Sequence, residues 1–238
     1  MVTSAPDIRA EIRSISITEY MTCLSSRSFS STMYTAKLSS NYRNVMSRFP
    51  PTPREQLSAP QQEAYDELSS SSEKMFGNKF SFKNKDGGMV GPYPFLLEAL
   101  GPGVDFLSLV QSLGKLPGLS AEARETTILT VGAHFQAGYE MYAHSAIARQ
   151  ATKLSQEAIS SICKGEKPKD LDEDCTAAYD VAKYLASKPG ALPQVLWERS
   201  VKTLGREGTV ALVHYVGLYA YTCIVLNAMD APVPKDGE

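Results

Sequence analysis

Apolar residues recur at helical spacing along most of the chain after residue 57. Ser58 and Pro60 are typical of a helix start, and the helix that they open is predicted to pass through Leu68 and end at Gly77. Similar periods predict further helices over residues 95–100, 103–113, 121 to 132 or 138, 139–152, 156–165, 174–187, 193–204 and 207–228. Strand-like alternation bounded by turn residues is not found, so the predicted fold class is all-α, a helical bundle.

The first 47 residues differ in composition from the predicted helical domain, residues 48–238. Residues 1–48 contain eleven serines and no sustained apolar period, which predicts a disordered tail or leader. Basic residues accumulate after Glu19, as in an organelle leader, so a mitochondrial location is the alternative to the expected cytoplasmic one. A third explanation is a gene-model artefact, because Met46 offers a second start. Residues 77–94 are rich in Gly and Pro and predict a long loop of the kind that covers sites.

The last predicted helix is the most apolar. Its run from Val210 to Leu226 has 17 residues and is interrupted by His214, Gly217 and Thr222. A bilayer span needs about 20 largely apolar residues. We therefore expect a core or subunit-interface helix, and no membrane association.

Composition excludes several function classes. Lys plus Arg is 24 and Asp plus Glu is 26, and this net charge of −2 provides no basic field for nucleic acid. The four cysteines stand too far apart in sequence for a CxxC pair or a zinc ribbon. Gly-rich phosphate loops and GxSxG elbows are also missing from the sequence, so neither a nucleotide cofactor nor a serine hydrolase is expected.

Candidate chemistry gathers between residues 125 and 144. Glu140 and His144 are four residues apart on a predicted helix, which places a carboxylate beside an imidazole and suits acid–base catalysis. The competing interpretation is a solvated ion pair on a surface helix. A metal held by His134, Glu140 and His144 is not expected, because the spacing of ten between the histidines fits no helix motif.

The segment from Leu119 to Leu154 resembles the carboxymuconolactone decarboxylase family, which includes the alkylhydroperoxidase D branch. The resemblance rests on Leu119-Ser120 and Arg124-Glu125 at the helix start, on Tyr139-Glu140-Met141-Tyr142-Ala143-His144, and on Ile147-Ala148-Arg149. It extends more loosely from Arg48 to Pro234 and is strongest to fungal members. It implies an alkylhydroperoxidase D-like helical bundle that forms a homo-oligomer.

The resemblance also assigns site residues. The peroxidase branch uses a Glu, a CxxC pair and a His. Here the Glu falls on Glu125 and the His on His144, but the two cysteine positions are Ala137 and Glu140. Without a thiolate there is no nucleophile for a peroxide oxygen, so thiol peroxidase activity is not expected. The decarboxylase side of the family remains, and it uses no cofactor.

The resulting hypothesis is a cofactor-independent decarboxylase or related lyase acting on a small carboxylated metabolite, cyclic or acyclic, in a biosynthetic or aromatic-catabolic pathway. His144 would donate the proton, Glu140 would set its pKa, and Glu125 would complete a relay through water. His134 or Arg124 would stabilise the enolate. The alternative is a non-catalytic ligand-binding or assembly module. Convergence of Glu125, Glu140 and His144 in one pocket would favour catalysis.

Overall fold

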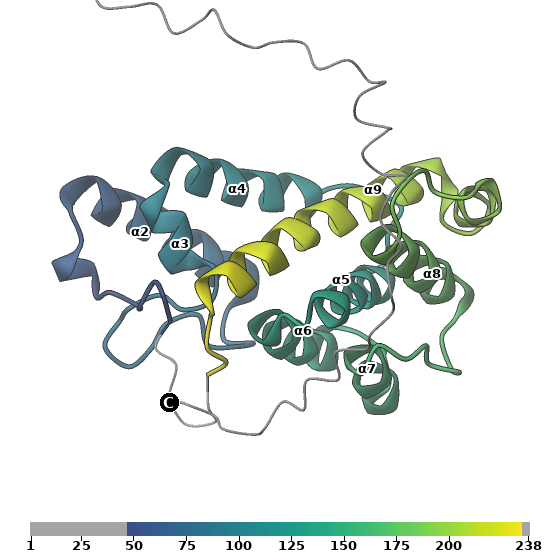
Figure 1. The fold of residues 1–238 in the computed structure, drawn as a ribbon, viewed down its shortest axis with the longest axis horizontal. Coiled ribbons are helices and arrows are strands. Elements are labelled where there is room, and N and C mark those ends of the chain that lie inside the picture. Colours follow the sequence, from purple (N-terminus) through teal and green to yellow (C-terminus); the bar gives the residue numbers. More distant parts are fainter. Residues whose placement is uncertain (1–46, 235–238) are drawn as a thin grey trace, which may run out of the picture. The chain divides into compact units, whose positions relative to one another are not determined.

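A computed structural model describes residues 47–234, and this part of the chain is helical (Figure 1). The prediction of an all-α class is confirmed: within the described residues the one strand-like pairing is a single bridge between Lys83 and Met89. The predicted leader, apart from Ser47, lies outside the described residues. In chain order the elements are a 3₁₀ turn, η1 (Arg54–Gln56), and the helices α2 (Ala59–Phe76), α3 (Tyr93–Glu98), α4 (Leu100–Leu113), α5 (Ala121–Phe135), α6 (Gly138–Ala151), α7 (Gln156–Cys163), α8 (Glu173–Ser187) and α9 (Gln194–Met229).

Serine side chains begin three of these helices, as the sequence predicts. The Ser58 backbone N–H donates to Gln61 Oε1 at 3.2 Å in a capping box at α2. Ser120 Oγ accepts from the Ala123 backbone N–H at 3.1 Å and starts α5. Ser155 Oγ does the same for α7. The first backbone N–H groups of a helix have no acceptor within the helix. Because these side chains accept hydrogen bonds from such groups, they fix where the first turn begins.

The predicted start of α4 at Gly103 is three residues late. The helix begins at Leu100, and Gly103 lies inside its first turn, where a Cβ atom would overlap the backbone carbonyl of Leu96 on α3. Glycine therefore marks a close approach between the two helices here, rather than a helix boundary. Pro102 is tolerated because first-turn positions have no helical hydrogen bond to lose.

Gly205 divides α9 into the two helices that the sequence predicts. Its backbone (φ 71°, ψ 172°) is non-helical, while the residues around it continue in helical conformation. Among the described residues α9 is the one helix long and apolar enough to cross a bilayer, with a mean hydropathy of 1.7 over 18 residues. However, 61% of that window is buried against the rest of the protein, as in a core helix.

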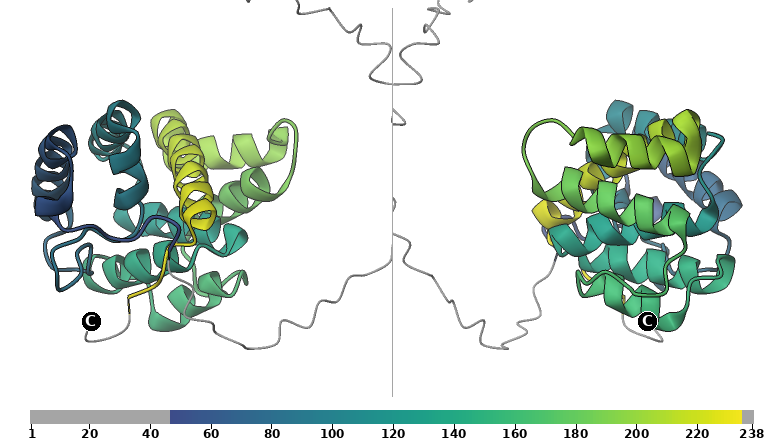
Figure 2. Two further views of the ribbon diagram at one scale, coloured as in Figure 1. Left: turned by 60° about the vertical axis from the view of Figure 1, so that its left-hand side comes forward. Right: turned by 90° about the vertical axis from the view of Figure 1, so that its right-hand side faces the viewer.

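The helices pack around three apolar clusters (Figures 1 and 2), of which the two described next border the site. The smaller cluster lies among α2, α3 and α4 and includes Leu68, Leu96 and Leu107. The larger one unites α5, α6, α8 and α9, with Ile128 and Leu212 among its fully buried members. The site described below is lined by residues from both groups of helices.

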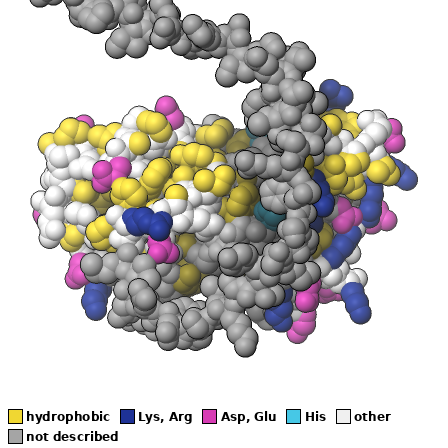
Figure 3. Space-filling model, viewed as in Figure 1, with side chains coloured by type: hydrophobic (Ala, Val, Ile, Leu, Met, Phe, Trp, Pro, Cys, Tyr) yellow, Lys and Arg dark blue, Asp and Glu magenta, His cyan; other side chains and the backbone are white. Residues whose placement is uncertain are grey.

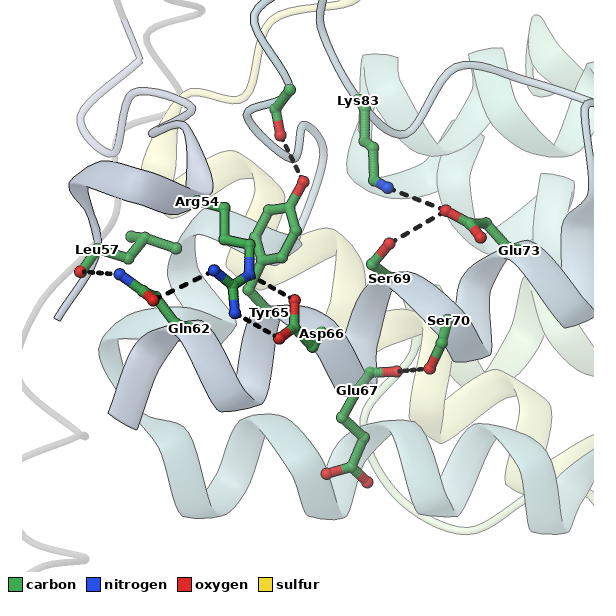
Figure 4. Close-up of polar contacts among 11 residues, drawn as sticks. Arg54, Leu57, Gln62, Tyr65, Asp66, Glu67, Ser69, Ser70, Glu73 and Lys83 are labelled. Atoms are coloured by element: carbon green, nitrogen blue, oxygen red, sulfur yellow. Dashed lines mark hydrogen bonds and ion pairs between the residues drawn. The ribbon is translucent and has the colours of Figure 1, made fainter. Parts of the chain in front are cut away.

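The loop over residues 77–92 is tied to both groups of helices. Figure 4 shows Lys83 Nζ reaching Glu73 on α2 at 2.9 Å, near the paired contacts of Arg54 with Asp66, which are both 2.7 Å. On the other side, Tyr139 Oη of α6 donates to the Ser81 carbonyl at 3.0 Å. The Arg54–Asp66 pair joins η1 to α2, whereas the Lys83–Glu73 pair and the Tyr139–Ser81 hydrogen bond are the contacts that anchor the loop on its two sides.

Candidate active site

A narrow cavity of about 60 Å³ lies where the two groups of helices meet. One wall comes from α2, α3 and α4 and is apolar except for the Tyr93 hydroxyl. The opposite wall comes from α6 and α9 and carries Glu140 and His144. The lining residues are Met75, Phe76, Phe80, Pro92, Tyr93, Leu96, Phe106, Leu107, Val110, Tyr139, Glu140, Ala143, His144, Tyr219 and Thr222.

His144 lies between two carboxylates. Its Nδ1 is 2.7 Å from Glu125 Oε2, and its Nε2 is 3.1 Å from Glu140 Oε1. All three side chains are buried, with 9% or less of each exposed. Glu140 and His144 are one turn apart on α6, whereas Glu125 projects from α5, which packs beside it. The contact of Glu125 with His144 is direct, where the sequence had suggested a relay through water.

These contacts hold the imidazole in its protonated form. Burial alone lowers the pKa of His144, but the charge and hydrogen bond of Glu125, assisted by Glu140, outweigh it and raise the pKa from 6.5 to about 10. At neutral pH the group is therefore an imidazolium, able to donate a proton and unable to accept one. Arg124, which lies 3.4 Å from Glu125 Oε1, brings the cluster to two positive and two negative charges.

Tyr219 on α9 completes the surroundings of His144, and the sequence analysis did not select it. Its ring meets the imidazole edge-on, with centroids 5.0 Å apart and an interplanar angle of 88°. Burial raises the pKa of Tyr219 well above 10, so its hydroxyl stays protonated. The only sequence signal was the spacing of Tyr215, Tyr219 and Thr222 along an otherwise apolar helix, which is also typical of core packing.

The two residues predicted to bind substrate lie outside the cavity lining. Arg124 is partly exposed, lies 3.4 Å from Glu125 Oε1 and is absent from the cavity lining, so it supports the carboxylate rather than a ligand. His134 is exposed in the last turn of α5, with its ring edge-on to Phe135. The structure thus brings Glu125, Glu140 and His144 together and leaves His134 apart.

Neither a metal cluster nor a thiol is found at this site within residues 47–234. The described residues hold no group of three His, Cys, Asp or Glu side chains arranged for a metal ion. Cys175 and Cys223 are buried, Cys163 lies beside Ser145, and none of these three lines the cavity. Burial raises the pKa of Cys175 to about 12, which keeps this thiol protonated and unreactive.

Comparison with known proteins gives a structural match only. No protein-family model matches the chain, and no curated protein matches it in sequence. The crystal structure of the debrominase Bmp8 without ligand superposes with a TM-score of 0.60 at 12% identity, covering 75% of this chain and 90% of Bmp8. The fold is shared with Bmp8.

A second Bmp8 structure gives the same result. It is a variant in which one cysteine is replaced by alanine, in complex with 2,3,4-tribromopyrrole, and it matches with a TM-score of 0.59 at 11% identity over 81% of this chain and 93% of Bmp8. At this identity the match shows the all-α fold and shows that an enzyme uses it. Membership of the carboxymuconolactone decarboxylase family stays a prediction.

Proposed function

We propose that this protein is a cofactor-independent lyase that uses His144 as a general acid, and that its reaction is the decarboxylation of a small ring carboxylic acid. The observation that carries the proposal is the buried imidazolium, held by Glu125 and Glu140 at the edge of an apolar cavity. Glu140 and His144 line the cavity, and Glu125 contacts His144 from behind that lining, and we take this cluster to favour catalysis over a passive binding module. Bmp8 supports the choice of a small ring, because its variant is in complex with a substituted pyrrole.

The geometry suits a proton donor to carbon. Nδ1 of His144 is occupied by Glu125, so the proton available for transfer is the one on Nε2, which lies 3.1 Å from Glu140 Oε1 on the wall that lines the cavity. In the proposed step the bond between the ring carbon and the carboxylate breaks, CO₂ leaves, and the carbon takes the Nε2 proton. A carbanion or enolate is far more basic than an imidazole of pKa about 10, so the transfer is downhill. A positioned acid of this kind contributes about 10²- to 10⁴-fold in rate.

Removal of bromine fits this cavity less well. Reductive replacement of bromine by hydrogen consumes two electrons, and no cysteine, metal or cofactor ligand set lines the cavity among the described residues. Loss of CO₂ needs a proton and no electrons, which matches the groups that are there. This difference favours decarboxylation over debromination in spite of the shared fold.

A homo-oligomer remains part of the proposal. An apolar groove of about 460 Å³ runs between α4 and α9, and the exposed side chains of Leu109, Val213 and Tyr221 lie along it. Figure 3 shows hydrophobic side chains on this face of the molecule. A second copy seated there would cover these side chains, and the test is the mass of the purified protein in solution.

The function is tested by CO₂ release from a panel of β-keto, hydroxyaryl and heteroaryl carboxylic acids. For any acid that is turned over, His144→Ala should lower kcat by about 10²- to 10⁴-fold with little change in KM, because the lost interaction belongs to the transition state. His134→Ala is the matched control, since His134 is exposed at the end of α5 and lies outside the cavity lining. Wild-type turnover in His144→Ala would contradict the mechanism.

A further inference from the structure

The cavity beside His144 is too small for a ring as it stands. Its volume is about 60 Å³, whereas a core cavity that binds benzene has about 150 Å³. The inner lining, which includes Leu96 and Ala143, is buried in the close-packed core, where atoms resist displacement. A ligand of this size can therefore enter only if the mouth moves. The partly exposed lining residues mark that mouth: Met75, Phe76, Phe80, Pro92, Phe106 and Val110.

Phe80 differs from the other mouth residues in where it lies. The others belong to α2, to α4 or to the N-cap of α3, whereas Phe80 lies within the loop that follows α2. Its ring centroid is 5.2 Å from that of Phe76 on α2 and 6.5 Å from that of Tyr139 on α6. Phe80 thus reaches from the apolar wall to the polar wall and closes the mouth between them.

The second part of the loop, residues 82–90, is fixed in place. The Val90 backbone N–H donates to the Phe82 carbonyl at 3.0 Å, which closes this part into a small hairpin. Phe82 and Met89 are buried in the apolar cluster of α2, α3 and α4. Movement of this part would expose core side chains to water, which is costly.

The first part, residues 77–81, is attached through side chains of α6. Three hydrogen bonds join them: Gln150 Nε2 to the Lys79 carbonyl at 3.0 Å, Tyr139 Oη to the Ser81 carbonyl at 3.0 Å, and the Ser81 N–H to Tyr142 Oη at 3.4 Å. Each bond contributes little net free energy, because water replaces it when the segment moves away. Gly77 begins the segment with φ +58° and ψ −125°, and a Cβ atom there would have nothing within 4 Å. A residue with this freedom can act as a hinge.

We propose that residues 77–81 form a gate that turns about Gly77, and that the Phe80 ring is the part that closes the cavity. In the open state water takes over the three hydrogen bonds with α6, and the ring leaves the mouth. The cavity then joins the solvent, and a ring can reach His144. The gate concerns entry to the cavity and does not depend on which reaction follows.

The test measures how often a thiol inside the cavity becomes accessible. Ala143→Cys places a thiol in the buried lining, and the nearly isosteric Thr222→Cys provides a second reporter. Each protein is treated with iodoacetamide under native conditions, and mass spectrometry of peptide fragments assigns the label to one residue. Cys223 is the internal control, because it is fully buried outside the cavity lining and reacts only on global unfolding. The introduced thiol should react at least about 10-fold faster than Cys223, since local opening costs less than unfolding.

Variants of the gate should change this relative rate in a set order. Phe80→Ala should raise it about 10- to 100-fold, because the closed state loses the packing of the ring. Tyr139→Phe and Gln150→Ala each remove one contact with the gate and should raise it about 2- to 10-fold, the range of one net hydrogen bond. Tyr65→Phe is the matched control, because Tyr65 Oη donates to the Gly87 carbonyl in the hairpin. It should leave the relative rate unchanged.

A combined variant tests whether Phe80 is the closing side chain. In the Phe80→Ala background, Tyr139→Phe should add less than about 2-fold, because the mouth is already open. A full additional effect would overturn the role of Phe80. An introduced thiol that reacts no faster than Cys223, or equal acceleration by Tyr65→Phe and Tyr139→Phe, would overturn the gate. Because the assay uses no substrate, its outcome is separate from the CO₂ assay that tests the proposed function.

Discussion

The two walls of the cavity differ in both origin and chemistry. Helices α2, α3 and α4 supply an apolar wall whose only polar group is a tyrosine hydroxyl bonded to Ser72. Helices α6 and α9 supply the wall that holds Glu140 and His144, with Glu125 of α5 behind it. The chain therefore separates the residues that set the shape of a ligand from those that set its chemistry. Substitutions on the apolar wall should therefore leave the pKa of His144 nearly unchanged. Substitutions on the polar wall should leave the shape of the cavity nearly unchanged.

The largest stability effect is expected on the polar wall, from Glu125→Gln. Removing one partner of a buried ion pair costs about 3–5 kcal/mol, because the imidazolium is left partly uncompensated. The substitution should also lower the pKa of His144, which Glu125 raises more than Glu140 does. Urea unfolding at pH 7 and NMR titration of the imidazole measure the two effects. Glu157→Gln, which replaces an exposed carboxylate on α7, is the control. An unchanged imidazole pKa in Glu125→Gln would show that the contact is not an ion pair.

The same pair predicts how wild-type stability depends on pH. The folded protein holds the His144 proton with a pKa of about 10, against 6.5 for the ordinary group. The contribution is therefore fully present below about pH 6.5, declines by up to about 1.4 kcal/mol per pH unit above it, and is lost above about pH 10. Unfolding free energies at pH 6, 8 and 10 test this decline, which should be weaker in Glu125→Gln. A wild-type stability that stays level across this range would contradict the raised pKa.

On the apolar wall, Leu96→Ala should enlarge the cavity without altering its charges. Leu96 is 3% exposed, and truncation of such a leucine costs about 2–5 kcal/mol. The matched control is Leu68→Ala, which removes a fully buried leucine from the same cluster but away from the cavity. Both variants should lose stability, and only Leu96→Ala should bind larger rings. The His144 pKa should be unchanged in both, and a large shift in Leu96→Ala would show that the two walls are coupled.

A smaller effect is expected where the loop meets the polar wall. Gly91 has φ +72° and a Cβ atom there would overlap the Tyr139 ring, whereas Gly87 has φ +81° and nothing within 4 Å. Both alanine variants suffer the backbone strain of a positive φ, about 1 kcal/mol. Gly91→Ala adds an overpacking term of about 1–3 kcal/mol. The difference in melting temperature between Gly91→Ala and Gly87→Ala measures the overpacking contribution. Equal melting temperatures would mean that the Tyr139 ring moves aside at no cost.

The smallest effect is expected from the thiols. Alkylation of the native protein with iodoacetamide should leave turnover unchanged, since no described cysteine lines the cavity. Cys163 is the accessible site, and Cys163→Ser is the control for modification there. Loss of activity on alkylation, restored in Cys163→Ser, would place a thiol in the mechanism.

The polar wall was more predictable from sequence than the apolar wall. The spacing of four between Glu140 and His144 indicates adjacency on one helix, because the α-helix repeats every 3.6 residues. Glu125 has no such local signal, since it lies 19 residues from His144 on another helix, and only the family resemblance indicated it. Leu96, Phe106 and Tyr93 look like ordinary core positions in the sequence. Only the packing of α3 and α4 turns them toward a cavity.

The balance of charge around His144 has a consequence for the order of events in a catalytic cycle. Arg124, Glu125, Glu140 and protonated His144 sum to zero, so an anionic substrate meets a neutral site. Once the proton has moved to carbon, the site carries one net negative charge and repels the next carboxylate. In the proposed reaction, a proton from solvent must therefore return before a new substrate can enter. Reprotonation of the imidazole, rather than arrival of substrate, would then open each new turnover of that reaction.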